Sequence, residues 1–202
     1  MEKIGLYGGT FAPPHLGHVH AARAFLRAIP LDRLIVMPTF QQHHKAKSAG
    51  DTSEVRLEMC RAAFAGIPGV EVSDYEITKA DVSYTVQTLR YLTAENREIY
   101  MLCGTDMFLT LEKWYQAEEI FQLAKIVCMS RTTEKEPDIA ETHARYLQKF
   151  GQDCILLTED PLEVSSTRIR EARRTGQSLT AYVPAEVEAI LRRDGLYKGT
   201  ES

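Results

Sequence analysis

The apolar positions of this chain fall into short runs that alternate with longer segments of helical periodicity. The runs are three to five residues long and bounded by polar or turn residues, as is typical of strands buried on both faces of a sheet. Six strands are predicted: Ile4–Tyr7, Leu34–Met37, Val70–Val72, Ile99–Cys103, Ile126–Met129 and Ile155–Leu157. Seven helices are predicted: His15–Ala28, Ser53–Ala65, Tyr84–Thr93, Ala117–Leu123, Ile139–Phe150, Ser166–Arg174 and Pro184–Arg193.

This alternation predicts the fold class. Helices that separate successive strands indicate βαβ units, whose crossovers are almost always right-handed. We therefore expect an α/β fold with a Rossmann-like, doubly wound and mostly parallel sheet, and with helices on both faces. Ligands of such folds bind outside the carboxyl ends of the strands, where the strand order reverses.

Length and composition favour one ordinary globular domain. The 202 residues suffice for one core, and neither a linker nor a repeat divides them, so a single domain is expected over residues 1–202. No apolar run is long enough to span a membrane, and the start of the chain lacks the apolar region of a signal peptide. We therefore expect no membrane partner and a cytoplasmic location.

Charge and cysteine content limit which kinds of ligand and partner the sequence predicts. The net charge of −4, without a long basic block, argues against nucleic acid as the main partner. The four cysteines are far apart and form no C-x-x-C pair, so the sequence predicts neither a zinc site nor a disulfide framework. An anionic ligand would have to be held by local cations.

The run from Gly8 to His18 joins the first predicted strand to the first predicted helix, and it is the strongest candidate for chemistry. Gly8 and Gly9 let the backbone approach a ligand closely, and Thr10 adds a hydroxyl. His15 and His18 are three apart at a helix start, so they share one face beside the positive end of the helix dipole. This arrangement favours an oligophosphate ligand over a plain turn with two solvated histidines.

A second run, Val164–Arg170, follows the last predicted strand and opens a helix. Ser165 or Ser166 suits the N-cap, and free backbone N–H groups, hydroxyls and arginine form an anion cradle. Alone, this run could equally be a capped helix with basic surface residues. Together with the first run, it favours a binding site for a nucleoside triphosphate.

The two runs together resemble the signatures of the nucleotidylyltransferase superfamily, H-x-G-H after the first strand and S-S-T-x-x-R near the C-terminus. His15 makes the first run similar to that of bacterial nicotinate-nucleotide adenylyltransferases, since the phosphopantetheine enzymes usually have threonine there. The similarity extends over about residues 3–197. Further matching segments are Val36–Pro38 with His44 and Lys45, Ser83–Leu89, Gly104–Asp106 with Trp114, Tyr182–Pro184 and Leu196–Tyr197.

The resemblance implies a set of site residues. It implies His15, His18 and Arg170 as catalytic groups. It implies contacts with ATP from Gly8, Gly9, Thr10, Phe11, Asp106, Ser166 and Thr167. It implies contacts with the second substrate from His44, Lys45, Thr85, Trp114 and Tyr115. All of the last group except Tyr115, and also Asp106, have an ordinary alternative as a helix-terminal, core or solvated loop residue.

The implied reaction joins ATP and nicotinate mononucleotide into nicotinate adenine dinucleotide and pyrophosphate. Magnesium would be held mainly by the ATP phosphates, with no protein metal site, and a homo-oligomer is a possible assembly. The sequence departs from the family pattern in two places: Ala12 replaces an aspartate, and Gln41 and Gln42 replace a Pro-Pro pair. The missing aspartate either only braced the turn or helped to place magnesium or phosphate. The alternatives are an adenylyltransferase for another acceptor, such as nicotinamide mononucleotide or phosphopantetheine, and a nucleotide-binding regulator that has lost the chemistry.

Overall fold

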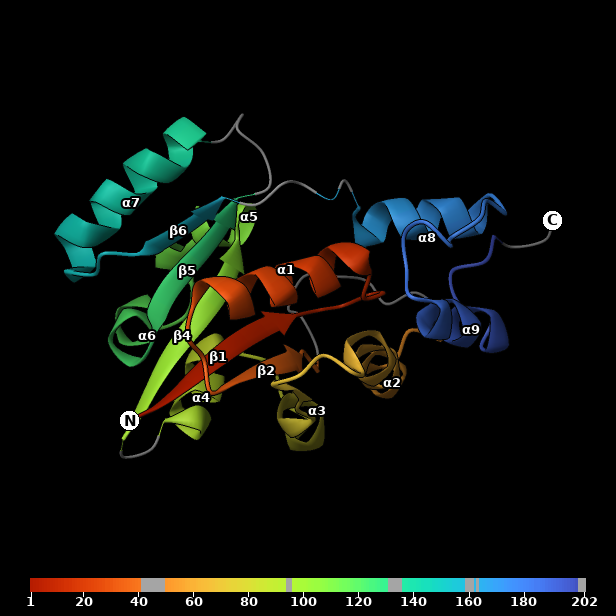
Figure 1. Ribbon diagram of the computed structural model, residues 1–202, viewed down its shortest axis with the longest axis horizontal. Helices are drawn as coiled ribbons and strands as arrows, with labels where there is room; N and C mark the ends of the chain where they lie inside the picture. Colours follow the sequence, from red (N-terminus) through yellow and green to blue (C-terminus); the bar gives the residue numbers. More distant parts are fainter. Residues whose placement is uncertain (41–49, 94–95, 131–135, 159–161, 163, 200–202) are drawn as a thin grey trace.

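The computed structural model describes residues 1–40, 50–93, 96–130, 136–158, 162 and 164–199. At its centre is a six-stranded sheet in the order β3-β2-β1-β4-β5-β6, in which every neighbouring pair is parallel (Figure 1). The strands are β1 (Glu2–Gly9), β2 (Arg33–Pro38), β3 (Val70–Val72), β4 (Arg97–Gly104), β5 (Lys125–Ser130) and β6 (Ile155–Thr158). All six predicted strands are confirmed.

The seven predicted helices are also confirmed, with small shifts at their ends. They are α1 (Leu16–Ala28), α2 (Ser53–Phe64), α4 (Thr85–Leu92), α6 (Ala117–Leu123), α7 (Glu136–Phe150), α8 (Ser166–Arg174) and α9 (Ala185–Arg193). Three short elements were not predicted: α3 (Tyr75–Lys79), α5 (Thr105–Phe108) and the 3₁₀-helix η1 (Leu111–Lys113). Each has five residues or fewer, too few to show a helical period in the sequence.

Two hydrophobic clusters cover the two faces of the sheet. Because successive strand residues point to opposite faces, Tyr7 and Val36 belong to one cluster while Leu6 and Met37 belong to the other. The first cluster includes residues of α1, α2, α8 and α9, and the second includes residues of α4, α6 and α7. The expected doubly wound arrangement is therefore confirmed, and burial on both faces explains the apolar runs of the central strands β1, β2, β4 and β5.

The strand order reverses next to β1. The chain passes from β1 outward to β2 and β3, then returns to β4 on the other side of β1 and continues to β5 and β6. Figure 1 shows α8 and α9 near the tip of β1, beside the start of α1. The carboxyl ends of β1 and β4 are therefore the place where a ligand is expected. In the part of the chain that the structure describes, no helix is long and apolar enough to cross a membrane.

Candidate active site

The glycines at the end of β1 open this edge of the sheet. A methyl group built on Gly8 would meet no atom within 4 Å, whereas one on Gly9 would lie 3.0 Å from the ring of Phe11. Gly8 thus borders open space, which suits a ligand that approaches the backbone. Gly9 has a second reason to be glycine, because the Phe11 ring occupies the space beside it.

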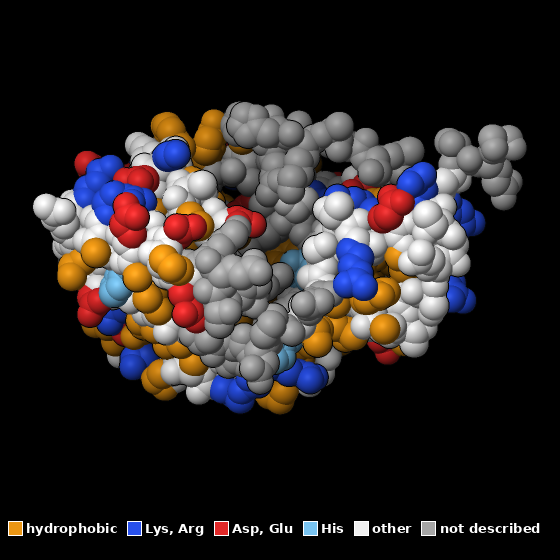
Figure 2. Space-filling view, turned by 90° about the horizontal axis from the view of Figure 1, so that it is seen from above, with side chains coloured by type: hydrophobic (Ala, Val, Ile, Leu, Met, Phe, Trp, Pro, Cys, Tyr) orange, Lys and Arg blue, Asp and Glu red, His pale blue; other side chains and the backbone are white. Residues whose placement is uncertain are grey.

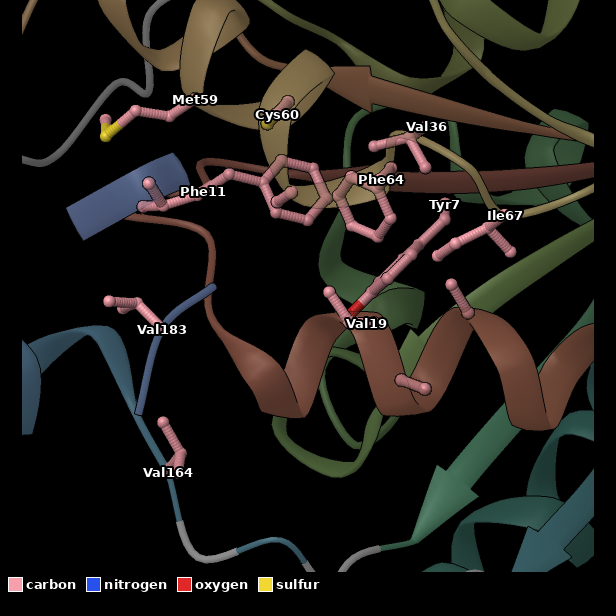
Figure 3. Packing of buried hydrophobic residues seen from close by; sticks show 14 of the residues in the cluster. Tyr7, Phe11, Val19, Val36, Met59, Cys60, Phe64, Ile67, Val164 and Val183 are labelled. Carbon is pink, nitrogen blue, oxygen red and sulfur yellow. The ribbon is translucent and has the colours of Figure 1, made fainter. Parts of the chain in front are cut away.

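Phe11 fixes the turn to the core. Its side chain is only 2% exposed and packs edge-on against Tyr7 and Phe64, with ring centroids 5.4 and 6.0 Å away. Figure 3 shows the ring pointing toward Phe64 of α2. Its φ of 50° lies in the left-handed region, which a non-glycine residue adopts only where its surroundings hold it. The contact with ATP that the resemblance implies for Phe11 would therefore come from its backbone.

The two histidines of the first run cap α1. The His18 backbone N–H donates to His15 Nδ1 at 3.3 Å, and the His15 backbone N–H donates to His18 Nδ1 at 3.2 Å. The rings stack with their centroids 3.6 Å apart, and His15 is 2% exposed whereas His18 is half-buried. This reciprocal pair is a capping box in which histidines take the usual places of Ser/Thr and Glu/Gln.

The capping box also assigns the imidazole protons. A ring nitrogen that accepts a hydrogen bond carries no proton, so the neutral form of each ring holds its proton on Nε2. Both histidines are therefore set as Nε2–H donors by contacts within the first turn of α1. Gly17 completes the arrangement, since a methyl group there would lie 3.0 Å from His15 Nδ1.

The second run meets the first directly. Ser165 caps α8 by accepting a hydrogen bond from the Arg168 backbone N–H. The Ser166 hydroxyl donates to the Pro13 carbonyl at 2.9 Å, and Arg170 donates to the Ala12 carbonyl at 2.7 Å. Arg170 also donates to the Thr167 hydroxyl at 3.1 Å. The structure thus brings the N-termini of α1 and α8 to one place, where their N–H groups and Arg170 suit an anion.

The surface of this region is shown in Figure 2. A histidine side chain is visible in the hollow near the centre of this face, and Lys or Arg side chains lie along its right-hand rim. Positive groups therefore border the hollow even though the chain is acidic overall. Among the described residues, no three His, Cys, Asp or Glu side chains lie together as a metal site would require.

The remaining predicted site residues surround the start of α4 and the segment after η1. Thr85 is the first residue of α4, and the preceding Tyr84 ring contacts Tyr115, with centroids 4.7 Å apart. Trp114 is half-buried against the second hydrophobic cluster, whereas Tyr115 is 56% exposed. The structure therefore brings Thr85 and the Trp114–Tyr115 segment together.

Two further predictions have different outcomes. Asp106 lies in the first turn of α5, at the carboxyl end of β4, and is exposed there. It is not the N-cap, because Gly104 has that position. His44 and Lys45 lie outside the described residues, so their role remains a prediction.

Comparisons with known proteins decide the family. Residues 6–172 match the model of the cytidylyltransferase-like family. A relative from Clostridium botulinum named "Probable nicotinate-nucleotide adenylyltransferase" is 31% identical and covers 98% of this chain and 99% of its own. A relative of the same name from Dehalococcoides mccartyi is 34% identical, over 96% of this chain and 97% of its own. The chain belongs to the nicotinate-nucleotide adenylyltransferase family.

Solved structures share the fold of this family member. The nicotinic acid mononucleotide adenylyltransferase of Plasmodium falciparum, complexed with APC, gives a TM-score of 0.76 at 15% identity, with 98% of each chain covered. The same enzyme complexed with NaAD gives a TM-score of 0.73 at 15% identity and the same coverage. At this identity the likeness supports the Rossmann-like α/β architecture and nothing finer.

This member of the adenylyltransferase family also has a buried arginine that the sequence did not single out. Arg56 of α2 is 5% exposed and donates to the Thr10 carbonyl at 2.7 Å and to the Phe40 carbonyl at 2.9 Å. Its Nε lies 3.7 Å from Asp51 Oδ1, and this ion pair compensates the buried charge. The sequence gives no sign of this burial, because a single arginine in a predicted helix looks the same whether it is buried or on the surface.

Glu76 of α3 is a second buried charged residue that the sequence did not indicate. It is 8% exposed and accepts a hydrogen bond from the Thr88 hydroxyl at 2.5 Å. Burial raises the pKa of this carboxyl, while hydrogen bonds from Ser83 and Thr88 act in the opposite direction. Glu76 is thus part of the packing beneath the start of α4.

Proposed function

We propose that this protein joins ATP and nicotinate mononucleotide into nicotinate adenine dinucleotide, with release of pyrophosphate. The observation that carries the proposal is the junction of the two phosphate runs. Ser166 and Arg170 bond to the carbonyls of Pro13 and Ala12, which are 153 and 158 residues earlier in the chain. Two helix N-termini, two histidines and an arginine at one edge of the sheet supply the hydrogen-bond donors and positive charge that the phosphates of ATP require.

The reaction requires only one displacement. A phosphate oxygen of the mononucleotide attacks the α-phosphorus of ATP and forms a new P–O bond. The bond from the α-phosphorus to the oxygen that bridges to the β-phosphorus breaks, and pyrophosphate leaves with that oxygen. Because the attacking phosphate is already an anion, no general base is required, and catalysis comes from positioning and charge stabilisation.

The phosphate runs supply these effects. The Nε2–H groups of His15 and His18 would donate to the α-phosphate and its bridging oxygen, where negative charge develops. Arg170, Ser166 and Thr167 would hold the β- and γ-phosphates, aided by the N-terminus of α8. Gly8, Gly9, Thr10 and Phe11 would contribute backbone contacts, and Thr10 a hydroxyl.

Magnesium enters this account as part of the MgATP substrate. Mg²⁺ prefers oxygen ligands and keeps several waters. The described groups around the turn are imidazoles, hydroxyls and a guanidinium, with Ala12 in the turn itself, so they fit the phosphates better than the metal. The ATP phosphates would therefore be its main ligands.

The acceptor would lie beside α4. The Thr85 hydroxyl and the backbone N–H groups at the helix start could receive the nicotinate carboxylate, since anions favour helix N-termini. Trp114 and Tyr115 would provide aromatic surface for the pyridine ring. Asp106 would accept hydrogen bonds from ribose hydroxyls, and His44 and Lys45 would reach a phosphate.

A pyrophosphate-release assay tests the proposal. ATP is supplied with nicotinate mononucleotide, nicotinamide mononucleotide or phosphopantetheine in parallel, and calorimetry measures ATP binding. The proposal is supported if pyrophosphate release is much faster with nicotinate mononucleotide than with the other two acceptors. Faster release with another acceptor would show that the proposed second substrate is wrong. Tight ATP binding without release from any acceptor would favour the regulator, the alternative that Ala12 motivates. A cytoplasmic location and a homo-oligomer remain predictions from the sequence.

A further inference from the structure

The segment after β2 is hydrogen-bonded to both halves of the site. The Phe40 carbonyl accepts from Arg56, which also binds the Thr10 carbonyl of the phosphate turn. The Phe40 backbone N–H donates to the Ser83 hydroxyl at 3.0 Å. Phe40, which the family resemblance does not assign to either substrate, thus connects Arg56 and the turn after β1 with the segment that leads into α4.

The connection continues beneath the acceptor segment. Ser83 stands two residues before Thr85 and lies close enough to the Glu76 carboxyl group to lower its pKa, and that carboxyl group accepts a hydrogen bond from Thr88 of α4. Together these contacts form a continuous polar path, here called the Arg56–Glu76 path, whose members are Thr10, Arg56, Phe40, Ser83, Glu76 and Thr88. Its charged members, Arg56 and Glu76, are both buried.

An in-line displacement makes such a connection useful. The attacking phosphate and the α-phosphorus come from two substrates held by separate elements, so their separation depends on how those elements are fixed to each other. Buried polar groups that are paired with one another have few alternative arrangements and rigidify what they join. Resting on the proposed function, we infer that the Arg56–Glu76 path positions the phosphate turn relative to the acceptor segment, with Arg56, Ser83 and Glu76 as positioning residues.

Ser83→Ala tests this inference with the least disturbance, because it removes one hydroxyl in the middle of the path. We expect kcat to fall about tenfold, since a shift well below 1 Å in the reacting groups is enough for such a loss. ATP binding measured by calorimetry should change less than about twofold, because the phosphate turn keeps its own contacts. Ser83→Thr restores the hydroxyl and should recover most of the activity.

Tyr146→Phe is the matched control for the loss of a buried hydroxyl. Tyr146 is fully buried in the second hydrophobic cluster and donates to the Phe108 carbonyl at 2.6 Å, outside the path. This variant should lose stability while its kcat stays near that of the wild type. A fall in kcat that follows the loss of stability equally in both variants would overturn the inference.

A second readout separates this inference from the proposed function. Amide chemical shifts report on Gly8–Phe11 whether or not the protein turns over nicotinate mononucleotide. Ser83→Ala should shift these amides, and Tyr146→Phe should leave them unchanged. If the wild type fails to release pyrophosphate but the shifts move, the proposed function is wrong and the structural connection stands. An active wild type with neither a kinetic nor a spectroscopic response to Ser83→Ala would reject the connection.

Discussion

The phosphate half and the acceptor half of the site are built differently. In the phosphate half, the candidate side chains bind backbone groups: His15 and His18 bind each other's N–H groups at the start of α1, and Arg170 binds a carbonyl of the turn. In the acceptor half, Tyr115 is largely exposed and Asp106 lies on the surface. The proposed donors to developing charge are fixed by contacts within the protein, whereas the proposed acceptor surface is open.

This difference has an energetic reason. Fixed dipoles stabilise a transition state without reorganising at the moment of reaction, so the groups around the α-phosphorus gain most from being locked in place. Recognition of a base and a sugar depends instead on aromatic surface and a few polar contacts, which tolerate small displacements. Substitutions in the phosphate half should therefore affect kcat, and those in the acceptor half should affect KM for the acceptor.

The largest effect is expected for His18→Ala. The substitution removes an Nε2–H donor and half of the capping box, so kcat should fall by about a thousandfold while the fold persists. Steady-state pyrophosphate release and far-UV circular dichroism measure the two quantities. His20→Ala, two residues further along α1, is the control and should retain most of its activity. Near-normal turnover of the His18→Ala variant would contradict the proposed role of His18 in stabilising charge on the α-phosphate.

Arg170→Lys should lower kcat by about a hundredfold. An ammonium is a point charge and cannot bind the Ala12 carbonyl, the Thr167 hydroxyl and a phosphate in the planar manner of a guanidinium. Arg168→Lys is a matched control in the same helix, since Arg168 is exposed and stacks on Tyr182. An equal loss of kcat in Arg170→Lys and Arg168→Lys would contradict a specific role of the Arg170 guanidinium contacts.

Thr85→Val tests the acceptor half with a nearly isosteric change. Loss of the hydroxyl should raise KM for nicotinate mononucleotide by about tenfold, the value of one hydrogen bond to a charged group, and leave ATP binding unchanged. Thr93→Val, at the other end of α4, is the control. A fall in kcat at constant KM would contradict the division between the two halves.

Glu76 of the Arg56–Glu76 path should make the free energy of unfolding of the protein depend on pH. Burial raises the pKa of Glu76 above the value of about 4.3 in an unfolded chain, although Ser83, Thr88, Lys79 and Arg56 oppose the rise. The resulting stabilisation is fully present below the unfolded pKa and is lost as the pH rises through the folded pKa. Wild type should therefore lose stability relative to Glu76→Gln as the pH rises from about 4 to 8 in urea denaturation. A difference that grows in favour of the wild type with pH would refute this assignment.

The smallest effect is expected for Ala12→Asp. The described contact at this position is made by the backbone carbonyl, which accepts from Arg170. If the family aspartate only braces the turn, the substitution should change kcat by less than about threefold, as at other positions without a specific role. A rise of about tenfold or more would show that a carboxylate here helps to place magnesium or phosphate.

The sequence predicted the fold well because the fold depends on patterns that a sequence displays. The six strands appear as short runs that are mostly apolar, and helices of seven residues or more show a period. The helices α3, α5 and η1 are too short for that signal. The two phosphate runs were found because several functional residues stand together in each.

The supporting residues could not be found in the same way. Arg56 and Glu76 are isolated charges in the sequence, and only the three-dimensional packing buries them beside the site. The proton positions on His15 and His18 follow from the cap geometry, which their spacing alone does not determine. The burial of Phe11 depends on Phe64 of α2, far along the chain.

We propose that the protein transfers an adenylyl group from ATP to nicotinate mononucleotide at the two joined phosphate runs. The most direct test is to incubate the wild-type protein with MgATP and nicotinate mononucleotide and quantify both products by chromatography. We expect equal amounts of nicotinate adenine dinucleotide and pyrophosphate, and neither product when nicotinate mononucleotide is left out. Pyrophosphate without the dinucleotide, or ATP bound and recovered unchanged in the presence of the mononucleotide, would contradict it.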